Sequence, residues 1–220
     1  MVNRPAQIER SSLEIIRTEL MSRGLCLSKD TEDVVLRCIH ASADFDYAEN
    51  LRFTSGAVGK GVAALRGGAS IVTDTNMALA GVSKTGLQKL GCAAQCFMAE
   101  PVIDELARAR GTTRAAASME YAAARLADAV YAVGNAPTAL FSLAEQMEKG
   151  FRPAMIIAVP VGFVNVVESK EKIYKLCTEY GVPCIAAMGR KGGSSIAAAI
   201  CNALIYTAAD MLDPAARGWN

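Results

Sequence analysis

The sequence predicts an α/β protein, a three-layer αβα sandwich with a mainly parallel, Rossmann-like sheet. Short apolar runs that end at Gly, Pro, Asn or Asp recur along the chain, and each is followed by a segment with helical periodicity. The apolar runs also lack polar alternation, which is typical of parallel strands that helices cover on both faces. We expect a single domain over residues 1–220.

Strands are expected at the apolar runs Ala69–Thr73, Ala93–Met98, Ala129–Val133, Ala154–Val159 and Pro183–Met188. The helices expected between and after them are Pro101–Arg110, Thr113–Leu126, Pro137–Lys149, Val166–Tyr180 and Ser194–Ala209. Several of these helices begin at Pro or Ser and stop at Gly, the usual asymmetry of helix ends. A further helix is expected before the first strand, where Asp30 or Thr31 caps it and His40 ends it.

The composition narrows the classes of function. Lys and Arg number 23 against 22 Asp and Glu, so the net charge of +1 gives no overall field for binding nucleic acid. Hydrophobic residues make up 52% of the chain and the mean hydropathy is +0.23, so we expect an oligomer that hides part of the apolar surface. The first residues do not form an export signal, and no apolar run reaches the roughly 20 residues that span a bilayer. The sequence therefore predicts a cytoplasmic protein that does not enter a membrane.

The cysteines do not predict a metal site. They number seven, and most lie among Ala, Ile or Leu in expected strands and helices, as small buried hydrophobic residues do. Cys92 and Cys96 form one C-x-x-x-C spacing, but no second pair completes a tetrahedral ligand set. We expect no bound metal.

Gly, Asn, Pro and polar residues follow the expected strands. Such residues allow tight turns and leave N–H groups free at helix starts, where anions bind. The sequence therefore predicts a site for a carboxylate-rich ligand at the carboxyl edge of the sheet. The loops in question are Asp74-Thr75-Asn76-Met77, Glu100-Pro101, Gly134-Asn135-Ala136-Pro137-Thr138, Pro160-Val161-Gly162-Phe163-Val164-Asn165 and Gly189-Arg190-Lys191-Gly192-Gly193-Ser194.

Two glycine-rich segments do not predict nucleotide binding. Gly59-Lys60-Gly61-Val62-Ala63-Ala64 precedes a strand, whereas a dinucleotide loop follows one, so its glycines indicate a tightly packed helix. The Gly189–Ser194 loop lacks the residue order that wraps a triphosphate.

His40 is the only histidine of the chain and the first candidate for proton chemistry, because imidazole changes charge near neutral pH. Asp44 and Asp46 follow it and could hold its imidazolium form. The alternative interpretation makes His40 a cation at a helix end and the two aspartates ordinary turn residues.

Arg114 is the first candidate for binding a carboxylate. It lies near an expected helix start, where the helix dipole disfavours a cation unless an anion is close. A surface or intersubunit salt bridge explains it equally well. The same two interpretations apply to Lys84, Arg190 and Lys191.

Taken together, these segments resemble the precorrin-8X methylmutase family, which includes cobalt-precorrin-8 methylmutases. The resemblance spans nearly the whole chain, and several such blocks in one order are highly specific. They are Ile8-Glu9-Arg10-Ser11, Arg37-Cys38-Ile39-His40-Ala41, Gly81-Val82-Ser83, Thr113-Arg114-Ala115-Ala116-Ala117, Gly134-Asn135-Ala136-Pro137-Thr138-Ala139-Leu140-Phe141, Pro160-Val161-Gly162-Phe163-Val164 with Glu168-Ser169-Lys170, and Gly189-Arg190-Lys191-Gly192-Gly193-Ser194.

The resemblance implies a homodimeric isomerase that moves a methyl group from carbon 11 to carbon 12 of a corrinoid ring, without a cofactor, in cobalamin biosynthesis. It implies that His40 interacts with a pyrrole-ring nitrogen and that Ser11 and Arg114 line the site. Ser83 stands where some relatives have threonine, which implies that its hydroxyl also binds the substrate. Arg190 and Lys191 are expected to bind substrate carboxylates.

The expected chemistry is general acid catalysis at a ring nitrogen, which His40 suits. The expected substrate is cobalt-precorrin-8, giving cobyrinate, because the Ala43–Asp46 stretch resembles relatives from the cobalt-early route. The alternatives are metal-free precorrin-8X, giving hydrogenobyrinate, and a non-catalytic tetrapyrrole carrier. A Rossmann-type oxidoreductase lacks support, since no G-x-G-x-x-G joins a strand to a helix.

Overall fold

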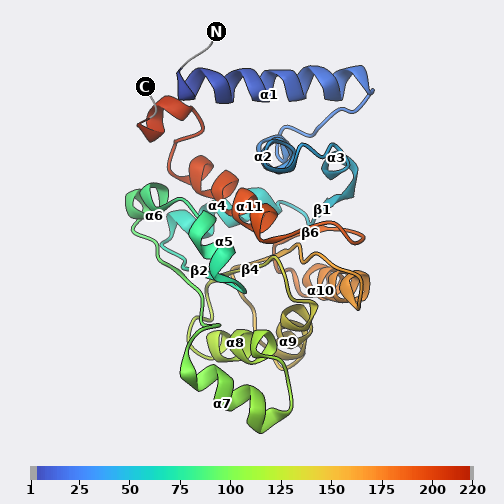
Figure 1. The fold of residues 1–220 in the computed structure, drawn as a ribbon, viewed down its shortest axis with the longest axis vertical. Coiled ribbons are helices and arrows are strands. Elements are labelled where there is room, and N and C mark those ends of the chain that lie inside the picture. Colours follow the sequence, from blue (N-terminus) through green and yellow to red (C-terminus); the bar gives the residue numbers. More distant parts are fainter. Residues whose placement is uncertain (1–3, 219–220) are drawn as a thin grey trace.

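A six-stranded sheet lies between two layers of helices in the computed structural model, which describes residues 4–218 (Figure 1). The strand order is β1-β6-β5-β4-β2-β3. All neighbouring strands are parallel except β1, which is antiparallel to β6. The predicted α/β class and mainly parallel sheet are confirmed. The strands are β1 (Leu51–Phe53), β2 (Ile71–Thr73), β3 (Ala94–Gln95), β4 (Val130–Val133), β5 (Met155–Ala158) and β6 (Cys184–Ala187).

Alternate residues of the central strands point to opposite faces and enter two separate cores. Val130 and Ala132 of β4 belong to one core, whereas Tyr131 and Val133 belong to the other. The first core is covered by α1 (Pro5–Ser22), α2 (Glu32–Ser42), α4 (Ala57–Arg66), α5 (Asn76–Gly81), α6 (Lys84–Leu90) and α11 (Ser194–Ala208). The second is covered by α7 (Pro101–Arg110), α8 (Arg114–Ala123), α9 (Pro137–Glu148) and α10 (Val166–Tyr180). The short α3 (Tyr47–Asn50) precedes β1, and the 3₁₀ helix η1 (Pro214–Arg217) ends the described chain.

Each predicted strand is present but shorter than expected, and the predicted helices α7 and α10 match residue for residue. Helix α8 begins at Arg114, because the Thr113 hydroxyl accepts a hydrogen bond from the Ala116 N–H and caps it. Helix α2 continues two residues past His40 and ends before Ala43, which has a left-handed φ of 55°. At Gly61 of α4 a Cβ atom would lie 2.6 Å from Met155 Sδ, so the prediction of a tightly packed helix is confirmed there.

Helix α1 is attached to the rest of the fold by a buried ion cluster. Glu9 Oε1 accepts hydrogen bonds from Arg37 (2.7 Å) and Arg217 (2.6 Å). Burial alone would raise the pKa of Glu9, but the two guanidinium groups outweigh it and the net shift is downward. Both guanidinium groups also lie over the Tyr206 ring of α11. The cluster therefore ties α1 to α2, α11 and η1.

None of the helices in residues 4–218 combines the length and apolar character needed to cross a membrane.

Candidate active site

The carboxyl ends of β2, β4, β5 and β6 share one edge of the sheet, as the sequence predicts for parallel strands. Asp74, directly after β2, is buried and accepts hydrogen bonds of 2.8 Å from the N–H groups of Gly134, Asn135 and Ala136. Burial raises the pKa of Asp74, although these N–H groups oppose the shift. Thr75 Oγ1 lies 2.8 Å from Ser194 Oγ at the start of α11. The loops after β2 and β4 are thus joined to each other and to α11.

The loops after β5 and β6 are joined through their backbones. The Gly193 N–H donates to the Val159 carbonyl at 2.9 Å, and the Gly162 N–H donates to the Arg190 carbonyl at 3.3 Å. At Gly192 a Cβ atom would lie 2.1 Å from the Val159 oxygen, so only glycine allows this approach.

Lys170 of α10 supports the second of these loops from inside the protein. Its side chain is 0% exposed, and its Nζ donates to the carbonyl oxygens of Gly189 (2.9 Å) and Lys191 (2.7 Å). Burial lowers the pKa of Lys170 to about 8. Lys170 was not identified as a site residue from the sequence. A signal was present, because Val166, Lys170 and Ile173 follow the spacing of one buried helix face.

His40 lies on the last turn of α2 with its side chain exposed. Among residues 4–218 its imidazole has no hydrogen-bond or ion-pair partner. The two aspartates expected to hold its imidazolium do not do so. Lys191 Nζ donates to Asp44 at 2.7 Å and to Asp46 at 2.5 Å, so these carboxylates fix the β6–α11 loop to the segment after α2. The lysine lowers the pKa of Asp44.

Lys191, which was predicted to bind a substrate carboxylate, is instead paired within the chain. Two of the three N–H donors of an ammonium group are engaged by carboxylates of the chain itself. Arg190 is different, since among the described residues it pairs with no carboxylate, and its guanidinium carbon lies 5.5 Å from the centre of the Phe163 ring.

Arg114, the first residue of α8, has an exposed side chain that lines a cavity of about 230 Å³ at the carboxyl edge together with Asp74, Thr75 and Asn76. Its Nε lies 3.6 Å from Asp104 Oδ1 of α7. The guanidinium is therefore loosely paired within the chain and still borders the loops predicted to bind anions.

Ser83 caps α6, because its hydroxyl accepts a hydrogen bond of 3.2 Å from the Gly86 N–H. Asn202 of α11 fixes this turn, since its Oδ1 accepts from the Ser83 N–H at 2.7 Å and its Nδ2 donates to the Gly81 carbonyl at 2.9 Å. The Ser83 hydroxyl proton can still be donated to a ligand. Asn202 was not identified from the sequence.

Ser11 is the only one of these candidates that lies on α1. It is exposed on α1, in a shallow hollow of about 460 Å³ that Glu14, Ile15 and Thr18 also line. Within the described residues Ser11 and His40 share no hydrogen bond or ion pair, and His40 does not line the hollow at Ser11.

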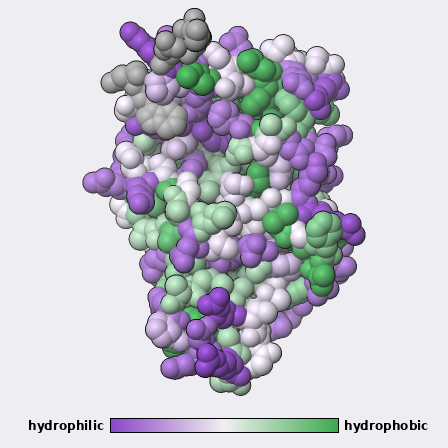
Figure 2. All heavy atoms as spheres, viewed as in Figure 1, coloured by the Kyte–Doolittle hydropathy of each residue, from purple (hydrophilic) through white to green (hydrophobic). Residues whose placement is uncertain are grey.

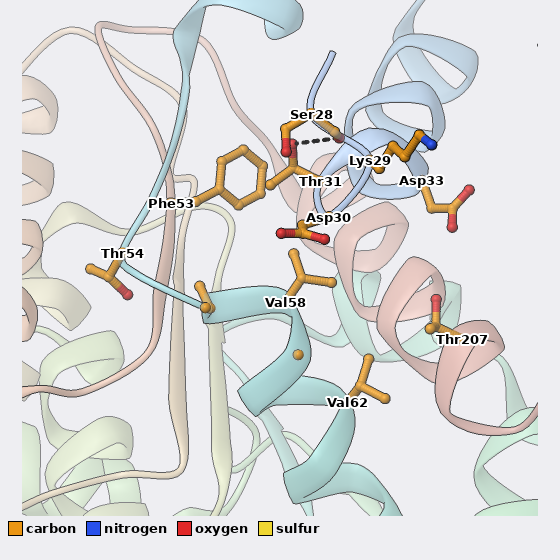
Figure 3. A pocket seen from close by; sticks show the side chains of 13 residues that line it. Ser28, Lys29, Asp30, Thr31, Asp33, Phe53, Thr54, Val58, Val62 and Thr207 are labelled. Atoms are coloured by element: carbon orange, nitrogen blue, oxygen red, sulfur yellow. Dashed lines mark hydrogen bonds between the residues drawn. The ribbon is translucent and has the colours of Figure 1, made fainter.

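A hollow of about 560 Å³ lies elsewhere, between the starts of α2 and α4 and the end of α11 (Figure 3). Figure 3 shows Phe53, Thr31 and Val62 around it, with the Thr31 hydroxyl donating to the Ser28 carbonyl at 3.3 Å. His40 is at the other end of α2, about 13 Å along the helix axis at 1.5 Å per residue. No predicted site residue lines this hollow.

Comparisons with known proteins agree along most of the chain. The family model of precorrin-8X methylmutase matches residues 7–207. Cobalt-precorrin-8 methylmutase of Leptospira interrogans is 39% identical over 212 residues, 93% of this chain and 94% of the relative. Precorrin-8X methylmutase of Pseudomonas aeruginosa is 40% identical over 198 residues, 90% of this chain and 93% of the relative. The crystal structure of precorrin-8x methyl mutase from Thermus thermophilus superposes with a TM-score of 0.82 at 39% identity, covering 92% of this chain and 98% of that one.

The fold and these matches define an isomerase of the methylmutase class. The chain belongs to the precorrin-8X methylmutase family. The predicted resemblance and the predicted enzyme class, a methylmutase of cobalamin biosynthesis, are confirmed.

Proposed function

We propose that this protein moves the methyl group of cobalt-precorrin-8 from carbon 11 to carbon 12, giving cobyrinate, with His40 as the proton donor to the conjugated ring. The observation that carries the proposal is the match to methylmutases over residues 7–207. An exposed imidazole without a partner in the described chain supports it, because such a group is free to meet a ligand. Protonation of the conjugated ring withdraws electron density from the migrating centre; in the metal-free substrate a ring nitrogen is open to accept that proton.

The metal-free substrate precorrin-8X, which would give hydrogenobyrinate, is the second candidate. It is favoured by the relative from Pseudomonas aeruginosa, whose identity of 40% is close to the 39% of the cobalt-precorrin-8 methylmutase from Leptospira interrogans. The test incubates purified protein with each substrate and follows the visible spectrum. We expect faster conversion of the cobalt complex. Conversion of neither substrate would contradict the enzyme proposal, and turnover of the metal-free form alone would select the second candidate.

A homodimer in the cytoplasm is part of the same proposal. Ile8, Ile15 and Met21 are large exposed hydrophobic residues on α1, and hydrophobic atoms are visible over this helix in Figure 2. Ile8, Ser11 and Ile15 follow helical spacing along one face. A second subunit that covers this face would bring Ser11 against the partner subunit.

Replacing Arg114 with alanine is expected to weaken binding of the product roughly 10- to 100-fold, because a charge-assisted hydrogen bond to a carboxylate contributes about 1.5–3 kcal/mol. Titration of the visible spectrum measures the dissociation constant. Arg108→Ala is the matched control, since this arginine is also exposed and lies in the last turn of α7. An unchanged constant for Arg114→Ala would show that Arg114 serves only its pairing with Asp104.

A further inference from the structure

The loop between β5 and α10 exposes large hydrophobic side chains. Phe163 is 82% exposed and Val164 is 76% exposed, and Val161 beside them is exposed as well. Burying such side chains is worth about 1.5–3 kcal/mol each, so leaving neighbours exposed on one loop indicates a surface that a ligand covers. Hydrophobic atoms are visible at the side of the molecule where α10 lies (Figure 2).

This loop is anchored at both ends. Its first part is bonded to the neighbouring loop through the Val159 carbonyl and the Gly162 N–H. At its other end Asn165, with a left-handed φ of 57°, leads into α10, where its carbonyl accepts the Ser169 N–H. The neighbouring loop is in turn held by the buried Lys170. The outward position of Phe163 therefore follows from anchored backbone on both sides of it.

The charged group nearest the apolar side chains is a cation. The Arg190 guanidinium lies 5.5 Å from the Phe163 ring centre, while the ammonium group of the next residue, Lys191, is bound by the carboxylates of Asp44 and Asp46. An apolar surface beside a cation suits a ligand that is flat and apolar in the middle and carries carboxylates at its rim. It suits a second protein less well, because that partner would have to supply both features at one small loop.

The β6–α11 loop, which carries Arg190, is also bonded to the segment that follows α2, the helix of the proposed proton donor His40. Asp44 follows α2 four positions after His40 and binds Lys191, the neighbour of Arg190. The end of α2 and the Phe163 surface are thus attached to one loop, at the carboxyl edge of the sheet.

We propose that Phe163 and Val164 form an apolar platform against which the corrinoid ring packs, and that Arg190 binds a carboxylate on the rim of that ring. This inference rests on the proposed function. It adds Phe163 and Val164 to the predicted site, which contained only polar and charged side chains, and it assigns them to the flat face of the ligand.

The test titrates the products of the two candidate reactions, cobyrinate and hydrogenobyrinate, into wild-type protein and into Phe163→Ser, Phe163→Leu and Arg190→Gln, following the visible spectrum. Phe163→Ser is expected to weaken binding roughly 10- to 100-fold and Phe163→Leu by less than about threefold. The loss in Arg190→Gln is expected to shrink in 1 M NaCl, and the loss in Phe163→Ser is not. Leu212→Ser, which changes an exposed hydrophobic residue near η1, is the matched control and should bind as wild type does.

Sedimentation of the same samples separates ligand binding from subunit contact. If Phe163→Ser binds the ligand with wild-type affinity, the proposal of an apolar platform is wrong. The proposed function is still supported in that case, provided that the wild-type protein converts its substrate. A shift of Phe163→Ser to a smaller species would overturn the platform too, because the loop would then be an interface between copies of the chain. Failure of wild-type protein to bind either product and to convert either substrate would overturn both proposals.

Discussion

Replacing His40 with alanine is expected to lower kcat by about 10²- to 10⁴-fold, the usual contribution of a positioned general acid. Binding of the product should change little, because the apolar ring and the carboxylates provide most of the contact. The thermal midpoint should also stay the same, since the His40 side chain is exposed and its imidazole bonds to no described residue. Single-turnover kinetics, followed in the visible spectrum, measure the rate of the methyl shift.

His40→Asn sharpens this test. Asparagine retains an N–H donor but cannot transfer a proton, so it should remain as slow as His40→Ala if the proton is required. Recovery in His40→Asn would indicate that His40 only orients the ring through a hydrogen bond. Lys29→Ala, an exposed change before the other end of α2, is the matched control. If His40→Ala turns over as fast as the wild-type protein, His40 is not the proton donor.

Most of the sheet was predictable because its strands are covered on both faces and therefore appear as continuous apolar runs. β1 lacks this signal, since it has only three residues and Arg52 in the middle is exposed. The strand exists because β6 offers it an antiparallel partner, with Leu51 opposite Ala187. Such pairing depends on distant residues and leaves no local pattern.

Helix α1 was not predicted for a related reason. Of its few buried positions, Glu9 is charged, and it is stabilised by Arg37 and Arg217 from distant parts of the chain. Periodicity analysis counts a glutamate as a solvent-facing residue. Only the folded chain shows that two arginines satisfy it.

The candidate site shows the same division. The anion-binding loops were predictable, because their position follows from the ends of the strands. The partners of Asp44 and Asp46 were not, since nearness in sequence suggested His40 whereas the folded chain supplies Lys191. Lys170 was overlooked because its acceptors are backbone carbonyls, which every sequence contains.

Replacing Lys170 with methionine is expected to lower the free energy of unfolding by about 2 kcal/mol at pH 7. The carbonyls of Gly189 and Lys191 lose their donor, at a cost of about 1–3 kcal/mol each, and this is partly offset because an ammonium group is no longer desolvated. The variant should also bind hydrogenobyrinate more weakly, since the loop that carries Arg190 loses its support. Urea unfolding and spectral titration measure the two effects.

The pH dependence distinguishes Lys170 from an ordinary packing residue. Its pKa is about 8 in the folded protein and near 10.5 in an unfolded chain, so the unfolded state binds more protons between these values. Lys170 therefore makes wild-type stability rise with pH in this window, a contribution that methionine lacks.

A neutral amine still has two N–H donors for the two carbonyls. The destabilisation by Lys170→Met should consequently grow from pH 7 to pH 10, while Lys175→Met, an exposed change on the same helix, should show no such growth. A constant difference across this range would mean that the buried amine keeps its proton and that both carbonyls require the charged form.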